Sequence, residues 1–284
     1  MSQFFQGTTT IQVPDAGGTN RARNVHWWRI PSSEIWLARS IANGAGQSIA
    51  HWNSANVSQT AVNCSFFEDA SPRTRVTTFA VQNGQPLMTG APQVTSQTDG
   101  SMNFQNMWPA GGGAPQNPLD FIGDPLNKAR DGSVFFGRAG QFPVTSVAHR
   151  TVTNVTMSMP RWLIGGMDLQ MTVRTIDTRA NFNRTVANGG WRWNIAGDIQ
   201  PSNTAIRRTA IGVVGNGDTN GADPFYIVAL FDQASVFDVR EFLRARGVTH
   251  FALNIDGGGT TQGRNRGTNL ISSTRGVPYV IAMR

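Results

Sequence analysis

The segment Phe251 to Thr261 (FALNIDGGGTT) carries the side chains with the clearest chemical potential. It reads as the end of a strand, in which successive side chains point to opposite faces. Its Phe, Leu and Ile then share one face and pack into the core, while Asn254 and Asp256 share the other face, away from the core. A carboxylate placed there can act as a base or a nucleophile. The alternative is a tight turn in which Asp256 only caps backbone N–H groups.

Gly257, Gly258 and Gly259 follow this carboxylate directly, and Thr260 adds a hydroxyl. Glycines allow positive φ angles and let backbone N–H groups approach an anion closely. The segment therefore predicts an anion-binding bend beside an acid side chain.

Four stretches together resemble the phosphodiester glycosidase family. Residues 254–260 (NIDGGGT) are similar to its NLDGGGS-type signature, and residues 61–67 (AVNCSFF) to its AVNGGFF segment. Residues 208–212 (RTAIG) match its RTAIG strand, and Arg275 resembles the arginine near its C-terminus. The resemblance runs from about residue 25 to the end of the chain, apart from residues 89–143. It implies hydrolysis of the glycosidic bond of a sugar 1-phosphodiester.

Such a reaction needs a cation on the phosphate, a carboxylate near the anomeric carbon and hydrogen bonds to the sugar. The resemblance implies Asp256 as nucleophile or base for water, with Glu68 as the second acid. Arg208 and Arg275 would hold the phosphate, together with the N–H groups of the glycine bend. The side chains expected to orient sugar hydroxyls or the phosphate are Asn63, Asn254 and Thr260.

Each of these residues also has a structural interpretation. Arg208 could pair with a surface acid, Arg275 could be a solvated strand-end residue, and Glu68 could belong to a turn. Asp232 joins the candidate binding residues because it ends an apolar strand, where polar side chains often line sites. Cys64, the only cysteine, stands where the family has glycine and is expected to be a buried, inert thiol.

No metal site is expected, because a single cysteine forms no cluster and the histidines lack ligand spacing. The reaction implied by the resemblance requires no cofactor, although a divalent cation beside Asp256 is compatible with the sequence. A phosphodiesterase using two metals is disfavoured for the same lack of clustered histidines and carboxylates. The four histidines are His26, His51, His149 and His250.

The elements that position these residues are mostly strands. Residues 236–246 form the one clear helix, with Ser235 as N-cap and Gly247 at the end, and residues 41–56 could hold a short second helix. We predict one α+β domain over residues 1–284, with mixed or antiparallel sheets. The predicted strands, including a hairpin at 76–88, are 25–30, 34–39, 60–67, 76–88, 146–159, 162–169, 171–176, 209–214, 225–231, 249–255 and 277–283.

Residues 89–143 are rich in Gly, Pro, Gln and Asn and are predicted to form a long inserted loop within this domain. Phe104, Trp108 and Phe121 favour a folded lid or partner surface over a free linker.

Composition narrows the class of protein. Charged residues are only 14% of the 284, against about 25% in typical domains, which excludes a charged disordered chain or a coiled coil. The longest apolar run, Phe225 to Phe231, is far shorter than the roughly 20 residues that span a bilayer. The net charge is +7, and Lys128 is the only lysine among 24 basic residues. Arginine suits phosphate partners, although a genomic preference for arginine explains this equally well.

The expected partner is a phosphate-linked glycan or cell-surface polymer, not nucleic acid, because no basic run exists. The first residues do not form a secretion signal, so we expect a cytoplasmic or virion-associated protein, or export without a leader. The alternative function is non-catalytic: a virion-, filament- or surface-associated protein that binds carbohydrate or self-assembles on the same fold.

Overall fold

The computed structural model describes most of the first 64 residues, separate strands between residues 80 and 168, and most of the last third of the chain. The described ranges are 5–42, 45–54, 59–64, 80–82, 85–86, 94–96, 101–104, 132–137, 144–145, 155–158, 162–169, 171–187, 203–215, 225–250, 252–255 and 257–284. Named strands pair antiparallel throughout these ranges, and three short α-helices accompany them, which confirms the α+β class.

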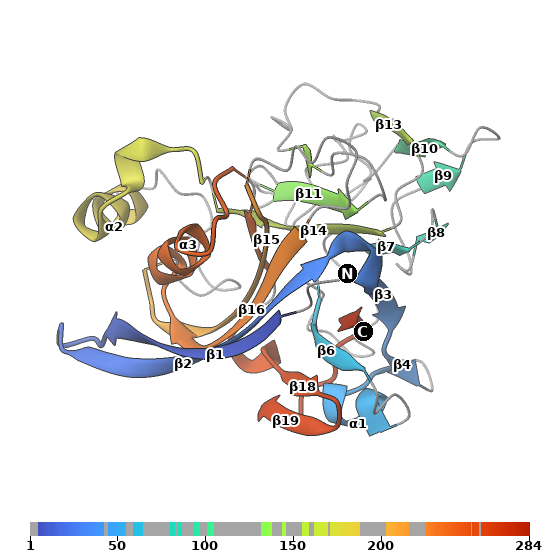
Figure 1. The fold of residues 1–284 in the computed structure, drawn as a ribbon, viewed down its shortest axis with the longest axis horizontal. Coiled ribbons are helices and arrows are strands. Elements are labelled where there is room, and N and C mark those ends of the chain that lie inside the picture. The colour runs from blue at the N-terminus through green and yellow to red at the C-terminus, as the bar shows by residue number, and fades with distance from the viewer. Residues whose placement is uncertain are drawn as a thin grey trace, which may run out of the picture.

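A ten-stranded sheet forms the body of the molecule. Its strands are β1 (Phe5–Pro14), β2 (Asn20–Pro31), β7 (Ala80–Gln82), β8 (Gln85–Pro86), β11 (Gly132–Gly137), β12 (Val144–Thr145), β14 (Trp162–Asp168), β15 (Ile206–Val213), β16 (Phe225–Ala234) and β17 (Ala252–Ile255). They follow the order β1, β2, β16, β15, β17, β14, β11, β12, with β7 and β8 branching from β14 (Figure 1).

A five-stranded sheet packs against one face of the first. Its strands are β3 (Ile35–Arg39), β6 (Thr60–Asn63), β18 (Gly263–Asn265), β19 (Thr268–Ile271) and β20 (Tyr279–Met283), in the order β19, β18, β6, β20, β3. Smaller pairings join β4 (Ile41–Ala42) to β5 (Ala45–Gly46), and β10 (Ser101–Phe104) to both β9 (Val94–Ser96) and β13 (Val155–Ser158).

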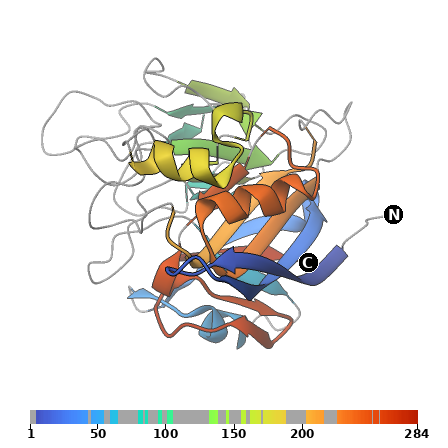
Figure 2. The ribbon, with the colours of Figure 1, turned by 90° about the vertical axis from the view of Figure 1, so that its left-hand side faces the viewer.

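The helices cover the outer faces of the two sheets. Apolar side chains of β16 alternate between a core shared with the second sheet and a core beneath α3 (Val236–Arg244), so both faces of this strand are buried. Figure 2 shows α3 lying across the strands of the large sheet. On the other side, α1 (Ile49–Ser54) packs its Ile49 on Ala61 and Val280 of the second sheet. The central strands therefore read as continuous apolar runs because neither face meets water.

Helix α3 begins as the sequence predicts. The Ser235 hydroxyl accepts from the Asp238 N–H, and the Asp238 carboxylate accepts from the Ser235 N–H in return. This reciprocal capping box satisfies two N–H groups that a helix start leaves unpaired. The helix ends at Arg244, two residues earlier than predicted, and Gly247 follows in the left-handed conformation.

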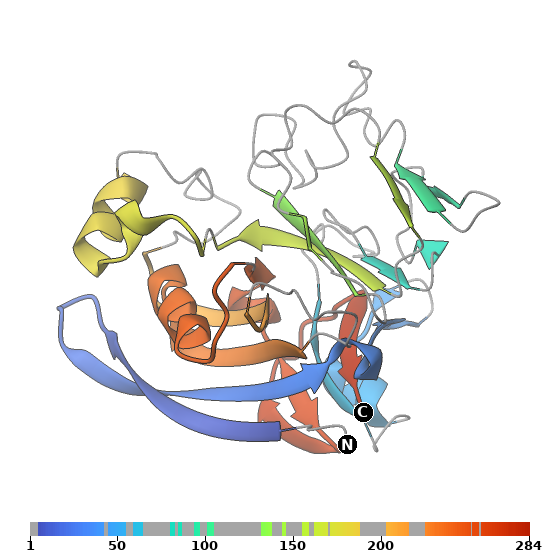
Figure 3. The same ribbon diagram turned by 45° about the horizontal axis from the view of Figure 1, so that its top comes forward.

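Several other secondary-structure predictions were wrong or incomplete. Residues 171–176 are not a strand: the chain turns there into a 3-10 turn, η4 (Arg174–Ile176), and then α2 (Arg179–Ala187), which the sequence analysis missed (Figure 3). The strand predicted at 25–30 lies within β2, but its hairpin partner β1 and the pair β18–β19 were missed. The region 89–143 is not loop throughout, because β11 lies within it and pairs with β14. A lid function for that region stays a prediction.

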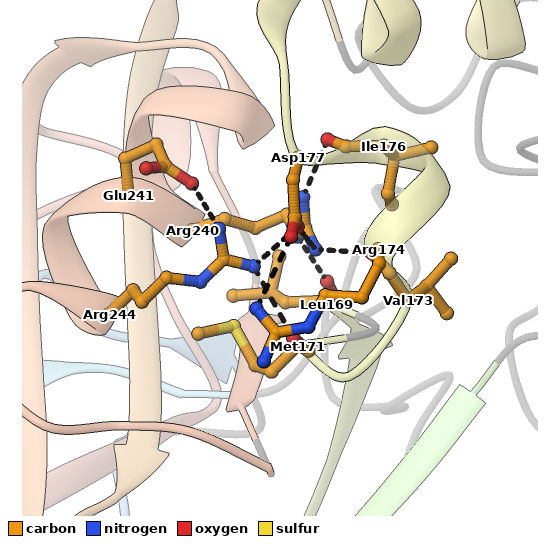
Figure 4. Close-up of polar contacts among 9 residues, drawn as sticks. All are labelled: Leu169, Met171, Val173, Arg174, Ile176, Asp177, Arg240, Glu241 and Arg244. Carbon is orange, nitrogen blue, oxygen red and sulfur yellow. Dashed lines mark hydrogen bonds and ion pairs between the residues drawn. The ribbon is translucent and has the colours of Figure 1, made fainter.

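A cluster of arginines attaches the segment after β14 to α3 (Figure 4). The Arg240 guanidinium is fully buried and donates to the carbonyl oxygens of Leu169 at 2.8 Å and Ile176 at 2.9 Å. Arg244 and Arg174 both donate to the Asp177 carboxylate. Burial acts to raise the pKa of Asp177, but these hydrogen bonds and the positive charge around it leave that pKa below its usual value. The charges therefore stabilise one another.

Candidate active site

The glycine-rich segment connects the two sheets. It leaves the large sheet at Ile255, which lies opposite Thr209 of β15, forms the 3-10 turn η6 (Gly258–Thr260), and enters the second sheet at Gly263, opposite Val62 of β6. We call residues 257–262 the glycine loop. Gly258 has φ +63°, as expected of a glycine in a sharp bend. Asp256 and Glu68, the two predicted acids, lie outside the described residues.

Asn63 ties the end of β6 to strand β15 and to the glycine loop. Its side-chain oxygen accepts from the Thr209 hydroxyl at 2.6 Å and from the Gln262 N–H at 3.3 Å. Its own backbone N–H donates to the Gln262 carbonyl. The predicted residue Asn63 therefore lies at the glycine loop, in a buried position.

Arg208 supports the glycine loop from the opposite face of β15. A side chain at Gly257 would touch the Arg207 carbonyl and the Cα and Cγ atoms of Arg208. The Arg208 guanidinium is buried and donates to the carbonyl oxygens of Ala234 at 2.8 Å and Thr204 at 3.0 Å. Burial lowers the pKa of Arg208 to about 10, although the Asp238 charge opposes this. This guanidinium therefore holds strand ends together instead of facing solvent.

Arg275 lies on the other side of the glycine loop. One terminal nitrogen of its guanidinium is 3.6 Å from the point where a Cβ would stand on Gly259. The Ser273 hydroxyl donates to the Gly259 carbonyl at 2.6 Å and accepts from the Arg275 N–H at 3.1 Å. The structure thus brings Arg275 and the glycine loop together, with Ser273 between their backbones.

Asn254 departs from its expected environment. It is only 2% exposed, because the second face of β17 packs in the core beneath α3, with Ala252 as a neighbour on that face. The prediction that this face points away from the core was wrong for Asn254. Its Nδ2 donates to the Ile255 carbonyl, and its Oδ1 finds no hydrogen-bond partner among the residues that the structure describes. Buried polar atoms without a partner are rare in folded proteins, and a catalytic role is one explanation for them.

Asp232 and Thr260 have different surroundings. The Thr260 hydroxyl donates to the Gly257 carbonyl at 2.5 Å and so closes the turn of the glycine loop upon itself. Burial lowers the pKa of His26 of β2, and the charge of Asp232, near the end of β16, opposes that shift in part. No contact of Asp232 with the glycine loop occurs among the described residues. The Cys64 side chain is buried, as predicted.

His26 should make stability depend on pH. Burial lowers its pKa below 6.5, and the Asp232 charge opposes the shift only in part. The unfolded chain then binds more protons than the folded one in the window just below pH 6.5, so His26 lowers stability as the pH falls through that window. We expect the difference in Tm between pH 7.5 and pH 5 to shrink in His26→Gln. An unchanged difference in thermal melts would contradict this assignment.

Gly276, the residue after Arg275, is predicted to tolerate no side chain. A Cβ there would overlap the backbone carbonyl of Gly46, which has no flexible side chain to move aside. Gly276→Ala should lower the free energy of unfolding by about 1–3 kcal/mol, as for other overpacked sites. Gly17→Ala is the matched control, because a Cβ at Gly17 meets only the Asp15 carboxylate at 3.4 Å. Equal urea-denaturation midpoints for the two variants would be inconsistent with the overlap.

Two further features concern metals and membranes. The described part of the chain contains no group of three or more His, Cys, Asp or Glu side chains that could hold a metal ion. Within the same part, no helix has the length and apolar character needed to cross a membrane.

Three polar residues at the site were not predicted from the sequence: Thr209, Gln262 and Ser273. Thr209 is fully buried and stands in β15 where two arginines give way to apolar residues, so a hydroxyl at the start of an apolar run was an available signal. Gln262 and Ser273 give no comparable signal, because polar residues near glycines are ordinary in turns.

Comparison with known proteins supports the fold. No protein-family model matches the chain, and no curated protein sequence matches it either. Its structure is similar to the catalytic domain of zebrafish N-acetylglucosamine-1-phosphodiester α-N-acetylglucosaminidase auto-inhibited by its pro-peptide, with TM-score 0.56, 14% identity, and coverage of 99% of this chain and 83% of that one.

A second similar structure is an uncharacterised Burkholderia pseudomallei protein described as exported, with TM-score 0.55, 13% identity, and coverage of 95% and 75%. At these identities the likeness concerns the fold. The described strands and helices are thus arranged much as they are in a phosphodiester glycosidase catalytic domain.

Proposed function

We propose that this protein hydrolyses the glycosidic bond of a sugar 1-phosphodiester. The observation that carries the proposal is the meeting of four separate sequence stretches at the glycine loop. Asn63 binds the loop at Gln262, Arg208 backs it at Gly257, and Arg275 lies at Gly259. Each stretch resembles a motif of the phosphodiester glycosidase family, and the fold is similar to that of one such catalytic domain. Motifs that meet in space are stronger support than motifs that match only in order.

The proposed roles divide between chemistry and binding. Asp256 acts as nucleophile or as base for water, and Glu68 is the second acid. Arg275 holds the phosphate, aided by N–H groups of the glycine loop, because a guanidinium matches phosphate geometry. Thr260 shapes the bend, and Asn254 and Asn63 orient the substrate or the loop. Asp232 stays a candidate for a more distant part of the substrate.

Arg208 takes a changed role in this proposal. Its donors are engaged by the carbonyls of Ala234 and Thr204, and its side chain is 2% exposed. It therefore acts through Gly257, whose backbone it supports, and the direct grip on phosphate falls to Arg275.

The substrate class is a phosphate-linked glycan or cell-surface polymer. The proposed reaction requires no cofactor; comparison of rates with and without chelator tests a divalent cation beside Asp256. Water adds its oxygen to the anomeric carbon as the bond from that carbon to the phosphate oxygen breaks. The products are free sugar and a phosphomonoester.

The test is product analysis in ¹⁸O-labelled water with a panel of sugar 1-phosphodiesters, including teichoic-acid-like polymers. We expect free sugar that carries the label, which marks cleavage of the carbon–oxygen bond. Label in the phosphate would instead indicate phosphorus–oxygen cleavage and reject the proposal. Binding of glycan without any product over long incubation would favour the non-catalytic carbohydrate-binding alternative.

A further inference from the structure

Gln262 is a buried polar residue that joins α1, the glycine loop and the Arg275 segment. Its Oε1 accepts from the N–H of Ile49, the first residue of α1, at 2.7 Å. Its Nε2 donates to the Arg275 carbonyl at 2.8 Å and to the Thr260 carbonyl at 3.4 Å. The side chain is 2% exposed, so these bonds form away from water.

We propose that Gln262 is a positioning residue, which fixes Arg275 and the glycine loop in the geometry that binds the phosphate. This inference rests on the proposed function. Only a neutral amide suits the position, because one end must accept from an N–H and the other must donate to carbonyl oxygens. A carboxylate would face two carbonyls without a proton to donate, and an apolar side chain would make none of the three hydrogen bonds.

The consequence for Arg275 follows from its backbone bonds. Its N–H is held by Ser273 and its carbonyl by Gln262, so the peptide groups on both sides are fixed. The guanidinium then leaves a fixed backbone beside Gly259. Catalytic groups must be held closely, since a displacement of about 1 Å can lower a rate by about a hundredfold.

The variants are Gln262→Met, which removes every side-chain bond, and Gln262→Glu, which keeps an acceptor for the Ile49 N–H. The matched control is Gln233→Met: Gln233 is half-buried and donates to the Ala205 carbonyl at 3.1 Å. For each folded protein we would measure KM and kcat on a sugar 1-phosphodiester, inhibition by inorganic phosphate, and hydrogen exchange of peptides covering residues 257–276.

We expect both Gln262 variants to raise KM and the inhibition constant of phosphate by about tenfold or more, and to speed exchange in 257–276. The control should change none of these. Normal KM, phosphate inhibition and exchange in a folded Gln262 variant would overturn the inference. If Gln262→Met does not fold, Gln262→Glu gives the same readouts.

The two proposals fail separately. If the wild-type protein hydrolyses no sugar 1-phosphodiester, the proposed function falls. Faster exchange and weaker binding of inorganic phosphate in the Gln262 variants, measured by calorimetry, would still support the positioning role. Unchanged exchange and phosphate binding would reject it.

Discussion

Asp256→Asn is expected to lower the hydrolysis of a sugar 1-phosphodiester by at least about a hundredfold, the usual scale for the loss of a principal catalytic group. The amide has nearly the same size as the carboxylate but cannot act as a nucleophile or accept a proton from water. The segment around it is well suited to this role, because the glycine loop that follows contacts three distant parts of the chain.

The control for Asp256→Asn is the same substitution at a carboxylate that has no proposed catalytic role. Asp15→Asn makes the same chemical change in the β1–β2 turn, where the Asp15 carboxylate accepts from Gly17 N–H, Thr19 N–H and Arg21. Initial rates and thermal melts should be measured for both variants. Near-normal turnover in a folded Asp256→Asn protein refutes the assignment of the catalytic acid.

Arg240→Met should lower the free energy of unfolding by about 3–5 kcal/mol. The guanidinium is 0% exposed and donates to carbonyl oxygens of the segment after β14, and also to Asp177 at 3.4 Å. Methionine fills similar space but donates nothing, so these carbonyls lose the hydrogen bonds that the guanidinium gives them. Burial, followed by repulsion from Arg244, lowers the pKa of Arg240. The charge is therefore retained at a desolvation cost that its hydrogen bonds must offset.

Arg174→Met provides the comparison for Arg240. Arg174 also pairs with Asp177, at 3.3 Å, but its side chain is 78% exposed. Exposed ion pairs contribute about 0–1 kcal/mol, so this variant should unfold close to the wild-type urea midpoint. If Arg240→Met lowers the free energy of unfolding no more than Arg174→Met does, the buried guanidinium is dispensable for stability.

The strands of the second half could be predicted because their sequences are unambiguous. β16 is a long apolar run, and α3 carries both a capping box and an apolar face. The missed elements lack those signals. β1 is rich in threonine and five of its ten residues are exposed, and within residues 179–185 of α2 only Phe182 is buried. The apolar residues of 171–176 suggested a strand, but backbone carbonyls of this segment instead accept hydrogen bonds from Arg240 and Arg244 of α3.

Part of the candidate site could be predicted because its residues, like those of β16 and α3, carry a clear local sequence signal. Glycines beside an acid are visible in sequence, and so is the asparagine that ends β6. The partners of these residues are not visible, because Asn63 and Thr209 are 146 positions apart and meet only through the stacking of two sheets. Arg208 shows the opposite error, since a charged residue in a strand suggests solvent but this one is enclosed.

The arginine attachment between α3 and the segment after β14 has a consequence for how the molecule opens. β14 pairs with β17 in the large sheet, and α3 is the helix that precedes β17 along the chain. β17 in turn leads into the glycine loop. Release of Arg240 would therefore loosen the strand on one side of β17 and the helix before it in a single step. Proteolysis or amide exchange should detect these parts as one cooperative unit, so the order of the glycine loop depends on the Arg240 cluster on the other side of β17.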